Sequence, residues 1–172
     1  RYVGHSNRAG WQITEAEYVA RELGVQRFVS AQNHYNLLDR RAELEVLPAS
    51  RALGLGVLPY FPLANGLLTG KYAAGVAQPG TRLSVTRAHL LETAVSPQLQ
   101  AYSAFARERD ISEVTVAIGW LLAQDPVASV IAGATRPEQV VANAAAAHWV
   151  PTPEDLAELD VLFAPPQQVA LY

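Results

Sequence analysis

Apolar and polar positions alternate along the chain between short apolar runs and longer stretches with helical spacing. The short runs predict strands over residues 1–5, 27–32, 56–60 and 127–132. The helical spacing predicts helices over residues 14–23, 40–53, 97–107, 112–124, 135–147 and 152–164. Strands that alternate with helices in this way indicate parallel pairing with right-handed crossovers.

Two of the predicted helices begin at a hydroxyl residue with a carboxylate three positions later. These pairs are Thr14 with Glu17 and Thr135 with Glu138. A side-chain hydroxyl and a carboxylate at this spacing satisfy the free N–H groups of a helix start. Both pairs are therefore expected to act as capping boxes.

Residues 61–95 break the rhythm of strands and helices. This stretch is rich in glycine and proline, including Pro62, Gly66 and Gly70. It is too long for an ordinary connection, and such segments are usually functional loops. We therefore expect a long loop here that is functional or mobile.

The element order fits two architectures, a doubly wound parallel sheet or a (β/α)8 TIM barrel. A full barrel typically needs about 250 residues, and the chain has 172. Its strand and helix units would supply half of a barrel, so strands five to eight are one assignment. The chain begins at Arg1 and contains no methionine, so we expect a fragment that forms a single domain over residues 1–172.

Composition narrows the classes of partner. The net charge is −3, Lys71 is the only lysine and the arginines are scattered, so neither nucleic acid nor a membrane surface is an expected partner. No apolar run approaches the about 18 residues of a membrane helix. The chain has no cysteine and its histidines lack ligand spacing, so we expect no metal site and a cytoplasmic location.

Polar, uncharged side chains follow the predicted strands. Ser6 and Asn7 follow the first, Gln32 ends the second and Tyr60 ends the third. Ligands bind at the carboxyl ends of parallel strands in both architectures. A hydroxyl and two amides can bind a carboxamide, and a tyrosine ring can stack on a flat heterocycle.

The fourth predicted strand leads into a different kind of site. Gly133 makes a turn, and Thr135 and Arg136 open the next helix. Free N–H groups at a helix start attract anions, and an arginine fork suits a phosphate monoester. Arginines at capped helices are common, so this signal alone is weak.

Four segments resemble one known family. They read GHSN at 4–7, QNHYNLLDR at 32–40, LPYFPLANGLLTGKY at 58–72 and GATRPEQVVAN at 133–143. In this order they resemble the aldo-keto reductase superfamily, in particular its longer-looped bacterial members and the potassium-channel beta-subunit-like branch. The resemblance implies a (β/α)8 barrel that uses NADPH to reduce aldehydes and ketones, with this chain covering its C-terminal half.

The resemblance also assigns cofactor contacts. It implies that Ser6, Asn7 and Gln32 hold the nicotinamide carboxamide and that Tyr60 stacks on the nicotinamide ring. The residues implied for the ribose and pyrophosphate are Phe61, Pro62 and Leu63, with Lys71 and Arg82 on a covering loop over residues 61–95. Those implied for the adenosine 2′-phosphate are Gly133, Thr135 and Arg136, and for adenine Gln139 and Asn143. Many relatives have glutamate where this chain has Ala142, which removes one adenine contact.

The family's catalytic Asp, Tyr, Lys and His come from its first half, so no catalytic residue is assigned in this chain. The resemblance therefore implies that the intact protein reduces a small carbonyl substrate and that these 172 residues alone are inactive. A non-catalytic half-barrel that binds nucleotide or a partner is the alternative. In either case we expect association with the missing half-barrel or self-association.

Overall fold

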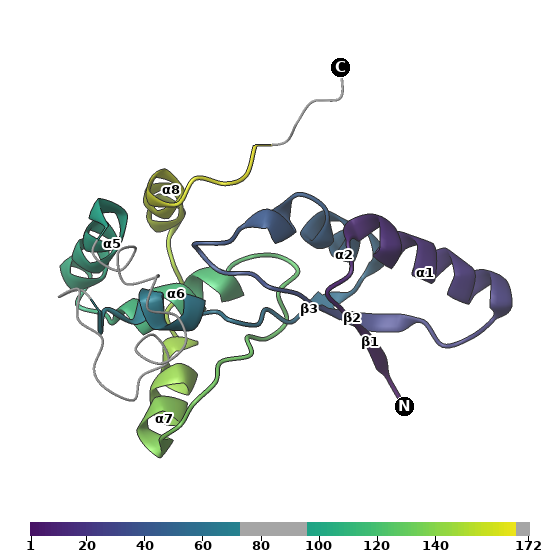
Figure 1. Ribbon diagram of the computed structural model, residues 1–172, viewed down its shortest axis with the longest axis horizontal. Coiled ribbons are helices and arrows are strands. Elements are labelled where there is room, and N and C mark those ends of the chain that lie inside the picture. Colours follow the sequence, from purple (N-terminus) through teal and green to yellow (C-terminus); the bar gives the residue numbers. More distant parts are fainter. Residues whose placement is uncertain (73–95, 168–172) are drawn as a thin grey trace.

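The computed structural model describes residues 1–72 and 96–167. A parallel sheet with two helices lies toward one end of an elongated molecule, and four helices lie toward the other (Figure 1). The strands are β1 (Val3–Ser6), β2 (Phe28–Gln32) and β3 (Gly56–Val57). The α-helices are α1 (Gly10–Leu23), α2 (Val46–Leu53), α5 (Pro97–Glu108), α6 (Glu113–Leu122), α7 (Pro137–Ala146) and α8 (Pro153–Leu162). The 3-10 helices are η1 (Arg41–Glu43) and η2 (Ala64–Thr69).

The strands are parallel and neighbours in chain order, β1-β2-β3, which confirms the predicted parallel pairing. Ser6 lies opposite Gln32, so β1 and β2 end level with each other. The fourth predicted strand is not a continuous strand. This segment runs parallel to β3 and the residues after it, and it is paired by two isolated bridges, one between Val127 and Val57 and one between Ile131 and Tyr60.

Pro59 accounts for this interruption. Leu58 and Tyr60 donate their backbone N–H groups toward β2, whereas Val57 donates to the carbonyl oxygen of Pro126 on the other side. The next N–H on that second side would belong to Pro59, which has none. The ladder to the fourth segment therefore loses a hydrogen bond, and the predicted third strand is shortened to two residues.

The first predicted helix start was wrong. Helix α1 begins at Gly10, and the Oε1 of Gln12 accepts a hydrogen bond of 3.0 Å from the N–H of Ala9. Thr14 lies inside the helix and its hydroxyl donates to the carbonyl of Gly10. An amide side chain three residues into the helix caps it earlier than Thr14 and Glu17 would have done.

The helix predicted over residues 40–53 is divided into η1 and α2. Pro48 explains the division, because its ring would clash with the carbonyl of Leu44 in a continuous helix. Proline is tolerated in a first turn, and α2 accordingly begins only at Val46. It ends at Gly54, whose φ of 71° is a left-handed conformation that glycine adopts without strain.

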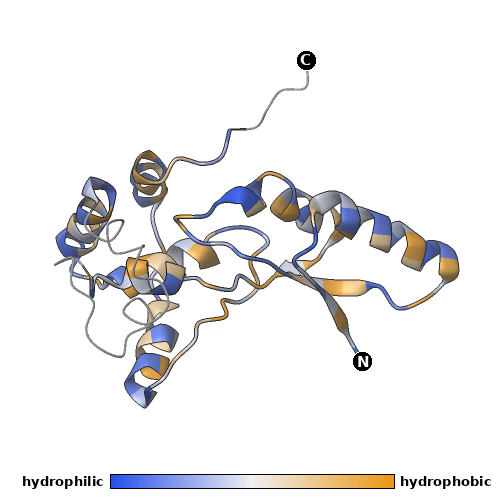
Figure 2. Cartoon of the chain, viewed as in Figure 1, coloured by the Kyte–Doolittle hydropathy of each residue, from blue (hydrophilic) through white to orange (hydrophobic). Residues whose placement is uncertain are grey.

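The core is one cluster of buried side chains that runs from α1 and α2 through the sheet to α5, α6 and α8. Helix α6 contacts α5, α7 and η2, and α5 also contacts α8. Figure 2 shows hydrophobic colour over most of α6, whereas α1 alternates between hydrophobic and hydrophilic positions. Trp120 on α6 is fully buried, and its ring centre lies 5.2 Å from that of Tyr35, which belongs to the segment that follows β2. This contact joins the sheet to the helical end.

Candidate functional site

Four of the predicted site residues meet at the carboxyl edge of the sheet. Ser6 ends β1 and Gln32 ends β2. The N–H of Asn7 donates to the carbonyl of Gln32 at 3.0 Å. The hydroxyl of Tyr60 donates to the Oδ1 of Asn7 at 2.7 Å. The sheet register therefore brings Ser6, Asn7, Gln32 and Tyr60 together, although they lie far apart in the sequence.

This edge keeps polar groups available. Ser6 and Asn7 are exposed, and the Nδ2 of Asn7 lies 3.3 Å from the hydroxyl oxygen of Ser6. Gln32 is half-buried, and its side-chain amide has no hydrogen-bond partner among residues 1–72 and 96–167. An amide can both donate and accept, and Tyr60 adds an aromatic ring at the same edge. This set of groups fits a planar ligand that carries a carboxamide.

Positive φ angles occur at this edge and in the segment that follows it. Positive φ angles occur at Asn7 (55°), Phe61 (55°), Ala64 (45°) and Asn65 (60°). Only one other non-glycine residue of the described ranges, Asp110, has a positive φ. This conformation costs about 1–2 kcal/mol per residue, and such strain persists mainly where function or packing requires it. The strain at Asn7 and Phe61 supports a functional site at this edge.

The turn after Tyr60 holds the next three predicted residues. Phe61 is exposed, Pro62 is buried and Leu63 is half-buried. The carbonyl of Phe61 accepts from the N–H of Ala64 at 3.0 Å, and that of Leu63 accepts from the N–H of Gly66 at 2.7 Å. These bonds form a tight turn that leads into η2, at the start of the predicted loop.

The two predicted cations of that loop differ in what is described. Lys71 is exposed, and its ammonium lies 4.8 Å from the ring centre of Tyr72. Its side chain also lies against Gly66, where an added Cβ would be 3.0 Å from the Cε of Lys71. Arg82 lies outside the described residues, as does the rest of the predicted covering loop after residue 72.

The second group of predicted residues lies at the start of α7. The segment that bridges Tyr60 at Ile131 continues to Gly133, which is exposed. Gly133 faces open space, because no atom lies within 4 Å of where a Cβ would stand. The two groups of predicted residues therefore follow neighbouring segments of the sheet, one after β3 and one after its bridged partner.

The cap of α7 differs from the prediction. The Oε1 of Gln139 accepts from the N–H of Thr135 at 2.8 Å and from the N–H of Arg136 at 3.2 Å. Thr135 and Glu138 do not form the expected capping box, because Gln139 occupies the position that caps from within the helix. The helix begins at Pro137, one residue after Arg136.

Arg136 and Asn143 complete this second group. Arg136 is exposed, and no ion pair to its guanidinium is found among the described residues. Asn143 is half-buried on the second turn of α7. The helix start therefore offers an unpaired positive charge and backbone N–H groups, an arrangement that favours an anion.

Three polar residues beside Tyr60 had no predicted role, namely His34, Asn36 and Asp39. The rings of His34 and Tyr60 are nearly parallel, at 14°, with their centres 5.4 Å apart. The Nδ1 of His34 lies 3.1 Å from Asp39, and its Nε2 lies 3.1 Å from the Nδ2 of Asn36. The signal in the sequence was an asparagine followed three residues later by an aspartate, which is typical of a side-chain-stabilised turn.

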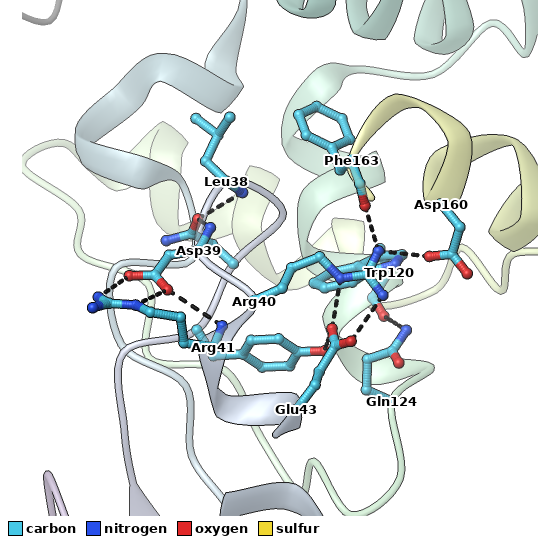
Figure 3. A network of polar contacts seen from close by, with 11 residues as sticks. Leu38, Asp39, Arg40, Arg41, Glu43, Trp120, Gln124, Asp160 and Phe163 are labelled. Atoms are coloured by element: carbon cyan, nitrogen blue, oxygen red, sulfur yellow. Dashed lines mark hydrogen bonds and ion pairs between the residues drawn. The ribbon is translucent and has the colours of Figure 1, made fainter. Parts of the chain in front are cut away.

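A buried arginine next to this turn holds the C-terminal helix in place (Figure 3). The guanidinium of Arg40 donates to Glu43 at 2.6 Å, to Asp160 at 2.6 Å and to the carbonyl of Phe163 at 2.6 Å. It also lies 5.1 Å from the ring centre of Trp120. Burial alone would lower the pKa of Arg40, but Glu43 and Asp160 outweigh it and raise that pKa.

Two kinds of site have no candidate in the described ranges, 1–72 and 96–167. No group of three His, Asp or Glu side chains there could hold a metal ion. No helix there is long and apolar enough to cross a membrane.

Comparison with known proteins gives one consistent result. The sequence profile of the Aldo/keto reductase family matches residues 1–163. The uncharacterized oxidoreductase YrpG of Bacillus subtilis is 42% identical over 139 residues, which cover 81% of this chain and 41% of YrpG. A probable voltage-gated potassium channel subunit beta of Oryza sativa is 35% identical over 94% of this chain and 52% of that protein.

A third relative carries an enzyme's name. A putative aryl-alcohol dehydrogenase of Schizosaccharomyces pombe is 30% identical over 96% of this chain and 47% of its own length. The chain thus spans about half the length of the curated relatives it matches. Since the family profile covers nearly the whole sequence, this chain belongs to the aldo/keto reductase family.

Proposed function

We propose that this chain is the C-terminal, NADPH-binding half of an aldo-keto reductase that reduces aldehydes and ketones. The observation that carries the proposal is the meeting of Asn7, Gln32 and Tyr60 at the carboxyl edge of a parallel sheet. In barrels of parallel strands this edge is where ligands bind. Family membership makes a nicotinamide cofactor the ligand that these groups would recognise.

The bound nicotinamide would supply a hydride, and the chain would orient it. Ser6, Asn7 and Gln32 would bind the carboxamide, while Tyr60 would offer its ring to the nicotinamide. Residues 61–63 would approach the ribose and pyrophosphate. Lys71 and Arg82 would add positive charge over the pyrophosphate.

The start of α7 would bind the other end of the cofactor. Gly133, Thr135 and Arg136 would take the 2′-phosphate, because an unpaired guanidinium at a helix start favours a dianion. Gln139 and Asn143 would contact the adenine.

The remaining half of the barrel would supply the catalytic Asp, Tyr, Lys and His. In support, the sheet leaves β1 as an edge strand, and Val3 and Val29 on its strands are exposed by 45% and 42%. Unpaired edges and apolar patches favour association. The missing half-barrel would cover them, and a second copy would do so in its absence. Sedimentation of residues 1–172 alone tests this, and a stable monomer would contradict it.

The cofactor assignment is tested by two matched glutamine variants of the full-length protein. Gln32→Ala removes the free amide at the carboxyl edge, whereas Gln26→Ala removes an exposed amide just before β2, at its opposite end. We expect only Gln32→Ala to weaken NADPH binding, by about 1–2 kcal/mol. Equal effects of the two variants would contradict the assignment.

Turnover separates the enzyme from the non-catalytic alternative. NADPH oxidation with an activated aldehyde is followed for the full-length protein and for residues 1–172. We expect turnover in the first and none in the second, because proton donation and carbonyl orientation come from outside this chain. NADPH binding without turnover by the full-length protein would favour a nucleotide-binding or interaction module.

A further inference from the structure

The orientation of the Asn36 side chain is fixed by its surroundings. Its Oδ1 accepts from the backbone N–H groups of Leu38 at 2.9 Å and Asp39 at 3.0 Å. Its Nδ2 must then be the atom that faces the carbonyl of Phe61 at 2.9 Å and the Nε2 of His34 at 3.1 Å. Asn36 is 1% exposed, so water does not compete for these bonds.

This orientation assigns the tautomer of His34. An amide nitrogen only donates, so the Nε2 of His34 accepts and its Nδ1 carries the proton. The Nδ1–H then points to the Oδ2 of Asp39 at 3.1 Å. Asp39 in turn accepts from Arg41 at 2.8 and 2.6 Å, and these bonds lower the pKa of its carboxyl group. The imidazole ring is thus held at both nitrogens.

The held ring covers Tyr60. His34 lies nearly parallel to the tyrosine ring, while Phe61 meets it edge-on with centres 5.3 Å apart. Within residues 1–72 and 96–167, the rings of His34 and Phe61 are the aromatic contacts of Tyr60. With its hydroxyl bound to Asn7, the tyrosine is fixed at one face, one edge and its tip.

We infer that His34, oriented by Asp39 and Asn36, is a positioning residue that fixes the ring of Tyr60 for a planar ligand on its other face. The inference rests on the proposed function, in which that ligand is the nicotinamide. His34 need not touch the cofactor. Its ring also meets that of Phe61 edge-on, with centres 5.6 Å apart, but its parallel contact is with Tyr60, so it should affect the stacked part of the ligand more than the remainder.

The test compares two probes on three variants of the full-length protein. NADPH contains the nicotinamide, whereas 2′-phospho-ADP-ribose lacks it and keeps the remainder. His34→Ala removes the ring, His34→Phe restores a ring without the two nitrogens, and His148→Ala is a control at an exposed histidine. Thermal unfolding of each variant reports whether it is folded.

We expect His34→Ala to weaken NADPH binding about three- to tenfold, the range of one aromatic contact, and to weaken 2′-phospho-ADP-ribose binding by less. His34→Phe should recover part of the loss, and His148→Ala should behave as the wild type. An equal loss for both probes, no loss for NADPH, or no recovery with phenylalanine would overturn the inference and leave the proposed function standing. Failure of the wild type to bind either probe would overturn both.

Discussion

The two ends of the proposed cofactor site are built differently. At the carboxyl edge, Asn7 and Tyr60 come from different units of the fold and bind each other, and His34 from a third unit stacks on Tyr60. At the start of α7, Thr135 and Arg136 are capped by Gln139 of the same helix. The geometry of the first end depends on the pairing of the sheet, whereas the second end is formed within one segment, residues 135–139.

Burial follows the same division. Helix α7 buries only Ala146, and its Val140 and Val141 are 58% and 70% exposed. Beside the carboxyl edge, Tyr35, Asn36 and Leu37 are all at most 2% exposed. A ligand therefore meets a rigid surface at the sheet, whereas Arg136 loses side-chain freedom only on binding. The sheet end should set geometry and the helix end should set charge selectivity.

The largest expected effect is a loss of folding stability, caused by removing Arg40 next to the turn behind Tyr60. Arg40→Ala leaves Glu43 and Asp160 without the cation that they share, so we expect unfolding free energy to fall by about 3–5 kcal/mol. The control is Arg51→Ala, whose partner Asp125 is 73% exposed and which should cost less than about 1 kcal/mol. Urea unfolding measures both. Similar losses would mean that the network of Figure 3 adds no more than a surface pair.

The next effect concerns the helix end alone and is seen by comparing the binding of NADPH with that of NADH. Arg136→Ala should weaken NADPH binding by about 1–3 kcal/mol, the value of a charged hydrogen bond, and leave NADH binding nearly unchanged. Unfolding free energy should not change, because the side chain is exposed. Isothermal titration with both coenzymes checks this, and equal losses would contradict the 2′-phosphate assignment.

The fold could be predicted as far as local patterns specify it. Apolar runs predicted the parallel strands in the right order, and the helices predicted over residues 14–23 and 40–53 end where α1 and α2 end. Helix starts failed at Thr14 and Thr135, because a glutamine nearby caps each helix instead. A glutamine and a hydroxyl residue can each cap a helix start, so the sequence alone does not decide between them. The direction of the backbone decides which side chain reaches the free N–H groups.

The strand errors have a different cause. Pro59 lies inside an apolar run that reads as a strand, yet it interrupts pairing on one side only. The sequence does not say which side faces β2, so the loss at the fourth segment could not be predicted. For the site, strand ends predicted that Asn7 and Tyr60 lie close together, but the bond between them and the His34 contact depend on tertiary geometry.

A smaller effect measures how strongly the rigid end is tied together. Tyr60→Phe removes the hydroxyl that donates to Asn7, and Asn7→Gly removes the acceptor while placing there a residue that tolerates a φ of 55°. A double-mutant cycle in urea should give a coupling of about 0.5–1.5 kcal/mol. Thr135→Ala with Tyr60→Phe, which spans the two ends, should give none. A coupling near zero in the first cycle would show that the edge is not preorganised by this bond.

The smallest effect is the pH dependence of the turn behind Tyr60. Hydrogen bonds from Arg41 hold the pKa of Asp39 below its ordinary value of 3.8. A carboxyl group with a lowered folded pKa stabilises the fold above its unfolded pKa, and this stability is lost as pH falls through the folded value. The unfolding free energy of the wild type should therefore exceed that of Asp39→Asn by a constant amount above about pH 5, and the difference should vanish in stronger acid.

Because Arg41 is 79% exposed, this difference in unfolding free energy should stay below about 1 kcal/mol and shrink with salt. Arg41→Ala should remove most of this pH dependence. A difference that grew on acidification would show that Asp39 is not held as a carboxylate, and that the orientation of His34 has another origin.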